Sequence, residues 1–297
     1  MRCIVVDSFP RINLFYLICR YMYFKFIRPQ NELLQKYLEG FYIFATDTVE
    51  DALEYIVFPS NHVIISIYNH AVLQIGKQSI AVKEDPNCGL NSLATFGFLQ
   101  PITFSYQHPI REIAFCFKSL GLNQFLKNDL IDYFEKELFS FFPFTDYEQE
   151  MISLLEEKQE DKIQQRIEAY WLSKYEEKDL GLLERAMELL EQPQNTIQQV
   201  ADELSISRQH MSRLFNTHLC KSPSQFRKIA RFRQTLQNRV ENVKQQDSLT
   251  SLTYESLFYD QSHLIKDFKA LTGMNPQKFF SKNQAFENGQ INWFFPD

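Results

Sequence analysis

One helical unit occurs twice in the C-terminal third of the chain, and this duplication limits the folds open to that region. The first copy includes LFNTHLCKSPSQF over residues 214–226, and the second includes DFKALTGMNPQKF over residues 267–279. In both segments a phenylalanine stands eight positions before a proline, and a second phenylalanine follows that proline by three positions. The repeat predicts two structural units built on one plan.

The first copy predicts two helices joined by a tight turn. Apolar residues at helical spacing mark the buried face of its first helix: Ile197, Val200, Ala201 and Leu204. Thr196 and Gln199 predict a capping box at the start of that helix. Residues 205–207 leave room only for a turn, and Ser207 can cap a second helix. That second helix buries Met211, Leu214 and Phe215. Helix, short turn and helix form the helix-turn-helix pattern.

The second copy repeats this plan with a less apolar first helix. We expect that helix over residues 249–256, carrying Leu249, Leu252, Thr253 and Ser256, and the turn over residues 257–259. The next helix buries Leu264, Phe268 and Leu271. A polar residue and a proline then start a further helix in each copy, with Ser222 and Pro223 in the first and Asn275 and Pro276 in the second.

The helix that links the copies sets the distance between them. We expect it from Pro223 to Arg239, which is roughly 25 Å at about 1.5 Å per residue. Successive major-groove faces of DNA lie about 34 Å apart. A rigid helix of this length could therefore hold two reading helices about one DNA turn apart.

Residues 181–282 resemble the DNA-binding domain of the AraC/XylS family of transcription regulators. The resemblance rests on QVADELSISRQHMSRLFNTHLCKSPSQFRKIARFR in the first copy and SLFYDQSHLIKDFKALTGMNPQKF in the second. It implies a sequence-specific DNA-binding regulator that is not an enzyme and needs no cofactor. Double-stranded DNA is the implied partner, with RNA polymerase and a small-molecule effector as further candidates.

Four positions depart from the family pattern. Ser205, Cys220 and Leu257 stand where the family favours Gly, and Thr253 stands where it favours Ala. A bulky residue such as Leu257 resists positive φ angles. We therefore expect the second turn to be strained or altered, with less certain DNA contacts in that copy.

The exposed faces of the second helices are the candidate DNA-reading surfaces, by helix geometry and by resemblance. The candidates in the first copy are Arg208, Gln209, Ser212 and Arg213. The candidates in the second copy are Gln261, Ser262, His263 and Lys266. Arg can bond guanine and Gln can bond adenine, whereas Ser and Lys more often hold phosphate. On the linking helix, Arg227, Lys228 and Arg231 are either phosphate contacts or a solvated basic face.

Charge is divided unevenly along the chain. The whole sequence has a net charge of −6. Residues 182–282 hold 14 Lys and Arg against 10 Asp and Glu, so the remainder holds 17 basic and 27 acidic residues. Local charge is what a partner meets, so the acidic total does not exclude a nucleic-acid binder.

Residues 22–122 are expected to form a β-rich sandwich or barrel. Strands are predicted over residues 63–68 and 71–75, with a turn at Asn69 and His70, and over ITFSY and REIAFCF further on. This region more weakly resembles the cupin-like sensor domains of the same family. Aromatic residues here could line an effector pocket or fill the core: Tyr68, Phe96, Phe98, Phe104 and Tyr106. The fold class is therefore α+β, with a β-rich first domain and an all-α last domain.

Residues 123–180 predict a helical connector between these domains. Its apolar side could mediate homodimerisation or pack within the monomer, and it consists of Ile152, Leu155, Ile163, Ile167 and Trp171. Residues 283–297 are expected to be a C-terminal tail. Residues 1–21 are either an N-terminal extension or, with Met22 as the true start, untranslated.

Two other functional classes remain as alternatives. A cupin-type metal-dependent enzyme would need a close His-x-His pair, which His62, His70 and His108 do not form, so we expect no metal site and no catalytic residues. The second alternative is a protein-interaction module whose basic helices bind an acidic protein. The apolar start of the chain is too short to span a membrane. Five cysteines without a CxxC pair indicate a reducing cytoplasm.

Overall fold

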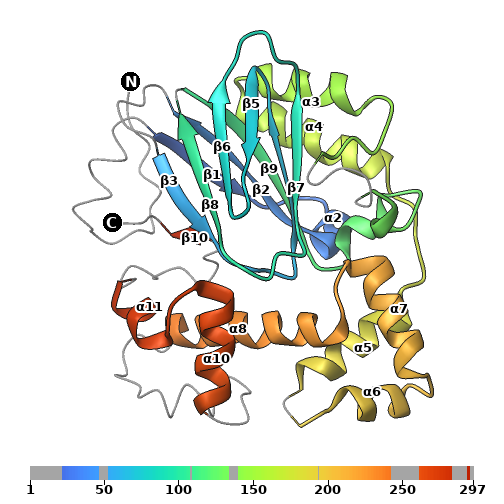
Figure 1. Ribbon diagram of the computed structural model, residues 1–297. Coiled ribbons are helices and arrows are strands. Elements are labelled where there is room, and N and C mark those ends of the chain that lie inside the picture. The colour runs from blue at the N-terminus through green and yellow to red at the C-terminus, as the bar shows by residue number, and fades with distance from the viewer. Residues whose placement is uncertain are drawn as a thin grey trace.

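The computed structural model describes residues 22–46, 53–107, 109–133, 140–192, 194–241, 261–282 and 293–294. Figure 1 shows a β-sandwich stacked on one side of a long helix, α8 (Pro223–Glu241), with further helices at both ends of α8. The predicted α+β class, with a β-rich first domain and a helical last domain, is confirmed.

Two five-stranded sheets form the sandwich. The first has the order β1 (Met22–Ile27), β2 (Leu38–Thr46), β9 (Arg111–Phe117), β4 (Val63–Tyr68) and β7 (Asn91–Thr95). The second has the order β10 (Trp293–Phe294), β3 (Leu53–Val57), β8 (Ile102–Gln107), β6 (Ser79–Glu84) and β5 (Ala71–Ile75). Neighbouring strands are antiparallel except β6 and β8, which run parallel. The strands predicted at 63–68 and 71–75 are confirmed.

Both faces of the first sheet are covered, because a strand sends alternate side chains to opposite faces. Ile113, Phe115 and Phe117 on β9 belong to a core shared with helices. Ala114 and Cys116 belong to a second core that lies between the sheets. The central strands therefore read as nearly continuous apolar runs rather than as an alternating pattern.

Helices from the first domain and from the connector cover the outer face of the first sheet. They are α2 (Glu32–Tyr37), α3 (Tyr147–Glu156) and α4 (Glu160–Ser173), with short 3-10 helices η1 (Gly121–Gln124) and η2 (Leu130–Tyr133). Ile163, Ile167 and Trp171 are fully buried in the core, and Trp171 packs edge-on against Phe117 at 4.8 Å. Four of the five residues named for this apolar side, Leu155, Ile163, Ile167 and Trp171, are buried within the chain, and Ile152 is partly buried.

The helical domain is arranged around α8 (Figure 1). One end holds α5 (Gly181–Glu191), α6 (Ile197–Glu203) and α7 (Arg208–Leu219), and the other holds α10 (Gln261–Thr272) and α11 (Pro276–Lys282). The two ends have separate cores, one around Met211 and Phe215 and the other around Phe232 and Phe268.

The helix starts follow the local sequence signals. Thr196 and Gln199 form the predicted capping box. The Ser207 hydroxyl accepts a hydrogen bond from the His210 amide at 3.0 Å. The Asn275 side chain accepts one from the Lys278 amide at 2.8 Å. The α8 helix extends to Glu241, two residues beyond the expected end. The first helix and turn predicted for the second copy, including Thr253 and Leu257, lie outside the described residues.

The segment expected as a tail contributes a strand to the first domain. In β10, Trp293 pairs with Val57 and Phe294 pairs with Ile56 of β3. An edge strand offers unpaired backbone N–H and C=O groups, which a passing extended segment can satisfy. Residues 293–294 of the segment expected as a tail thus pair with the edge strand β3.

Candidate nucleic-acid interface

The first reading helix, α7, presents its predicted residues to solvent. Arg208, Gln209 and Arg213 are exposed and Ser212 is half-buried. On the opposite side Met211 and Phe215 are fully buried, and Phe215 packs edge-on against Phe226 of α8 at 5.5 Å. The guanidinium of Arg213 lies 3.5 Å from the His210 ring. The packing of Phe215 against Phe226 orients α7 so that its basic face lies at the protein surface.

Two non-glycine residues near α7 adopt left-handed backbone angles. Ser205 in the turn before α7 has φ 56°, and Cys220 at its C-terminal end has φ 52°. These are two of the positions where the family favours Gly. The equivalent of Cys220 in the second copy is Gly273, with φ 74°. The backbone geometry of the unit is therefore kept at both positions although the glycine is lost.

The second reading helix, α10, is anchored by Phe268 and Leu271, which are fully buried. Lys266 is exposed on its other face. Gln261, Ser262 and His263 lie in the first turn of α10, and their side chains are outside the described residues. The prediction that these four residues read DNA remains a prediction.

The basic residues of α8 make contacts inside the protein. The Lys228 ammonium lies 3.2 Å from one carboxylate oxygen of Asp267 on α10, and the Arg231 guanidinium lies 3.7 Å from the other. Asp267 is 7% exposed. Arg227 is half-buried, and burial lowers the pKa of both Arg227 and Arg231. Lys228 and Arg231 thus join α8 to α10. The sequence had suggested either phosphate contacts or a solvated basic face, and an ion pair between helices is a third role.

The first domain contacts the first helix-turn-helix unit at the C-terminal end of α7. The Asn123 side chain in η1 donates to the His218 carbonyl at 2.9 Å, and the His218 ring lies 3.7 Å from Asp129. Leu120 joins the core of this unit. Arg208 and Gln209 lie at the other end of α7 and Arg213 near its middle, and all three are exposed with this contact in place.

The interior of the sandwich is filled by side chains. Tyr68, Phe104 and Tyr106 are buried between the sheets, while Phe96 and Phe98 are partly buried. Glu112 is 1% exposed and accepts hydrogen bonds from the Tyr42 and Tyr106 hydroxyls. Burial raises the pKa of Glu112. These aromatic residues act as core in this structure.

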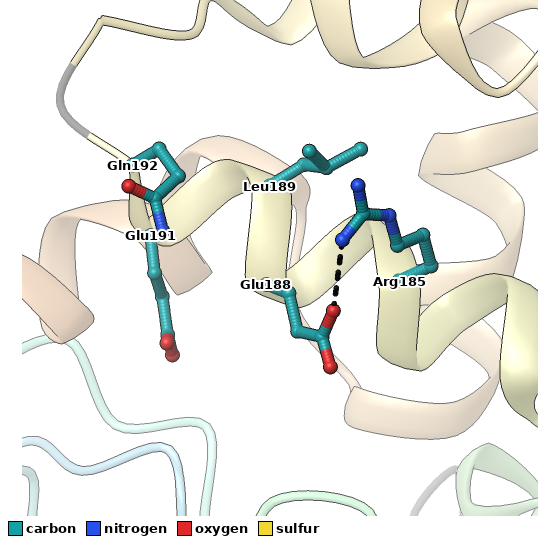
Figure 2. Close-up of a pocket in the computed structure, with 5 residues that line it drawn as sticks. All are labelled: Arg185, Glu188, Leu189, Glu191 and Gln192. Carbon is teal, nitrogen blue, oxygen red and sulfur yellow. Dashed lines mark hydrogen bonds and ion pairs between the residues drawn. The ribbon is translucent and has the colours of Figure 1, made fainter.

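Two shallow recesses lie on helices of the described part of the chain. One lies on α5 and is lined by Arg185, Glu188, Leu189, Glu191 and Gln192. Figure 2 shows the Arg185–Glu188 ion pair along its rim, with Glu191 pointing away from Arg185. Another lies at the α3–α4 turn. In the second recess the Ser153 hydroxyl accepts a hydrogen bond from the Arg166 guanidinium at 2.9 Å.

The described part of the chain holds neither a cluster of metal ligands nor a membrane-spanning helix. There, no group of three or more His, Cys, Asp or Glu side chains is placed to hold a metal ion. His108 lies outside that part. No helix within it is long and apolar enough to cross a bilayer.

Three comparisons place the chain beside known proteins. A family model for a helix-turn-helix domain matches residues 200–282. No curated protein matches the chain. Two similar solved structures are of ToxT from Vibrio cholerae. The unsaturated fatty acid-bound form is 13% identical, with 85% of this chain and 96% of that chain covered and a TM-score of 0.42. The form solved at 1.65 Å resolution is 11% identical, with 81% and 98% covered and a TM-score of 0.40.

The sequence prediction of a helix-turn-helix domain is confirmed. The sequence did not predict the contacts that three residues make around this domain. Phe58, Arg233 and Asp267 belong to contacts between elements far apart in the chain. A weak signal existed for Asp267, an acidic residue on the inner side of an otherwise apolar helix face. Phe58 carries no such signal, because one phenylalanine among 28 is unremarkable by itself.

Proposed function

We propose that the protein is a sequence-specific DNA-binding transcription regulator of the AraC/XylS type, and the match of residues 200–282 to a helix-turn-helix domain model supports this proposal. The observation that supports the proposal best is the exposed face of α7. Arg208, Gln209 and Arg213 are exposed on a helix fixed by the buried Phe215. Arg and Gln are the side chains that bond bidentately to guanine and adenine in the major groove.

The proposal includes a second reading helix, α10, at the other end of α8 (Figure 1). The 19 residues of α8 correspond to about 28 Å. Successive major-groove faces are about 34 Å apart. One chain can then read two neighbouring blocks of sequence, and the exposed Lys266 of α10 would meet the second block.

We infer a controlling role for the first domain. Its contacts with both ends of the helical domain support this role, because a change in the sandwich can be passed to the helices. A bound effector or an association of two chains could supply the change. An effector can act only if it binds the two states with different affinity. Cytoplasmic location fits the free Cys88, Cys116 and Cys220 of the described part.

Selection of genomic DNA fragments tests the proposed function. The wild-type protein should enrich one motif made of two blocks about 10 base pairs apart. Arg213→Ala should lose preference in one block and Lys266→Ala in the other. Lys36→Ala, an exposed cation on α2, is the matched control and should retain both. Failure of the wild-type protein to enrich any motif, alone or with cell extract as an effector source, contradicts the proposal.

Two measurements separate the competing classes. Stoichiometric iron, zinc or manganese in the purified protein would support the cupin-type enzyme. A module that binds an acidic protein would bind DNA without preference for one sequence. A regulator instead shows both a steep salt dependence and a preferred sequence.

A further inference from the structure

A loop of the first domain completes the packing of the second helix-turn-helix unit. Phe58 follows β3 and is 2% exposed. Its ring lies 5.1 Å from Phe279 of α11 and 6.3 Å from Phe232 of α8. Phe268 of α10 lies 5.1 Å from each of these two rings. Four phenylalanines from four elements thus form a closed cluster, and one of them comes from outside the helical domain.

Hydrogen bonds hold the backbone of this loop on α8. The Arg233 guanidinium donates to the Phe58 carbonyl at 2.6 Å and to the Pro59 carbonyl at 2.8 Å. The Asn61 side chain donates to the Phe226 carbonyl at 3.1 Å. Burial lowers the pKa of Arg233, yet a guanidinium remains charged at neutral pH. These charge-assisted bonds fix where Phe58 enters the cluster.

The segment after α11 strengthens the same connection. Trp293 and Phe294 pair with Val57 and Ile56, the residues directly before Phe58. The chain therefore leaves the second unit and returns to the strand that carries the loop. The loop itself is bonded to α8, and the strand directly before it is paired with β10.

The position of α10 depends on this cluster and on Asp267. Phe268 is in the cluster, and the neighbouring Asp267 pairs with Lys228 and Arg231 of α8. Lys266 comes directly before these two residues and faces outward. A shift of Phe58 would therefore move or loosen α10 relative to α8, and Lys266 with it. The direct hydrogen bond to α7 comes from Asn123, outside this loop, whereas Asn61 of the loop bonds the Phe226 carbonyl of α8 and not α7 itself.

We propose that the loop of residues 58–61 positions the second reading helix, so that the first domain controls reading of the second DNA block while the first block is read independently of this loop. The inference rests on the proposed function. Phe58 and Arg233 are positioning residues, since they act on DNA through α10. A signal that displaces the loop would convert a two-block reader into a one-block reader.

Binding of the full-length protein to three duplexes tests this inference. The duplexes are the motif selected by the wild-type protein and the same motif with either block scrambled. Phe58→Ala should lower affinity for the intact motif by about tenfold or more, toward that for the first block alone. Affinity for the duplex that retains only the first block should stay unchanged. Phe58→Leu should be intermediate, and Phe142→Ala, at an exposed phenylalanine, should match the wild type.

Amide hydrogen exchange without DNA gives an independent readout. In Phe58→Ala, exchange should rise in α10 and α11 and stay unchanged in α7. If Phe58→Ala fails to fold, Phe58→Leu and Arg233→Lys replace it, and the same selective effects are expected. The inference would be overturned if Phe58→Ala lowered affinity for both blocks equally or raised amide exchange equally in α7 and α10. It would also be overturned if Phe58→Ala kept the wild-type preference for the intact motif. A wild-type protein without any sequence preference would instead overturn the proposed function.

Discussion

At the scale of single residues, the structure explains two departures from the family pattern. Ser205 and Cys220 occupy left-handed positions that the family fills with Gly. A left-handed angle costs a residue with a side chain roughly 1–2 kcal/mol. The turn geometry persists because the helices on both sides are capped and packed. The chain tolerates this cost at two positions in its first unit.

Replacing Ser205 by Gly should stabilise the protein. Relief of the left-handed angle should outweigh the greater flexibility of Gly in the unfolded chain, which costs roughly 0.5–1 kcal/mol. We expect a net gain of about 0.5–1 kcal/mol in the free energy of unfolding. Urea denaturation measures it. Ser205→Ala is the control and should show no gain, because Ala keeps the strain. A loss of stability in Ser205→Gly would mean that the Ser205 side chain makes a stabilising contact.

His62, near the loop that carries Phe58, should make stability depend on pH. Burial lowers the pKa of His62 to about 4, with Arg233, Lys118 and Lys221 lowering it further and Glu39 raising it. The folded state thus binds a proton less readily than the unfolded state, whose His has a pKa near 6.5. This contribution is fully present above pH 6.5 and is lost as the pH falls through the folded pKa, by up to about 3 kcal/mol.

Urea denaturation between pH 7 and pH 4.5 checks this dependence. His62→Gln should be less sensitive to acid than the wild type. His70→Gln, in an exposed turn, should keep the wild-type slope. Equal slopes for His62→Gln and the wild type would contradict the expected role of His62.

At the scale of elements, α7, α8 and α10 divide the work of a DNA-binding domain. The exposed cations of α7 face outward, whereas two cations of α8 pair with Asp267 of α10. Under the proposed function, a basic helix would contact DNA in the case of α7, whereas the two α8 cations connect helices inside the protein. The two helices α7 and α8 carry a similar pattern of basic residues. How each helix packs decides whether those residues face solvent or pair inside the protein.

Arg213→Ala should weaken binding to the preferred sequence by about 1–3 kcal/mol and weaken binding to random DNA less. The reason is that an arginine on the exposed face of α7 can contact a base edge. Titration of a labelled duplex at one fixed salt concentration measures both affinities. Lys36→Ala should change neither. A uniform loss on all sequences would show that Arg213 contacts phosphate instead.

Asp267→Asn should lower the free energy of unfolding by about 2 kcal/mol, because Lys228 and Arg231 would lose a buried negative partner. The loss should be less than for a fully buried pair, since the Lys228 side chain is 29% exposed. Glu188→Gln removes an exposed ion pair with Arg185, visible in Figure 2, and should cost less than about 1 kcal/mol. Comparable losses for the two variants would show that the α8–α10 pair is not energetically special.

At the scale of the whole molecule, the first domain holds the two helix-turn-helix units by separate contacts. Asn123 and Leu120 contact the first unit, and Phe58, Arg233 and β10 connect the second unit to the sandwich. This arrangement means that the spacing of the reading helices depends on the sandwich as well as on α8. Regulation through the first domain then requires only a change in one of these contacts.

Sequence alone determined the features that depend on near neighbours in the chain. The caps at Thr196, Ser207 and Asn275, the strands at 63–68 and 71–75, and the buried face of α7 all follow from local spacing and side-chain chemistry. The helix-turn-helix assignment follows because its motif lies within one continuous stretch. The duplicated plan is visible for the same reason.

Only the tertiary structure decided which surfaces are covered and which charges are paired. The apolar side of α3 and α4 packs on the sheet, Lys228 and Arg231 pair with Asp267, and Phe58 enters a cluster more than 170 residues away in the chain. Burial and pairing between distant residues depend on how the whole chain closes on itself. Local spacing cannot specify them, because the same residue types would serve equally well on a solvated face.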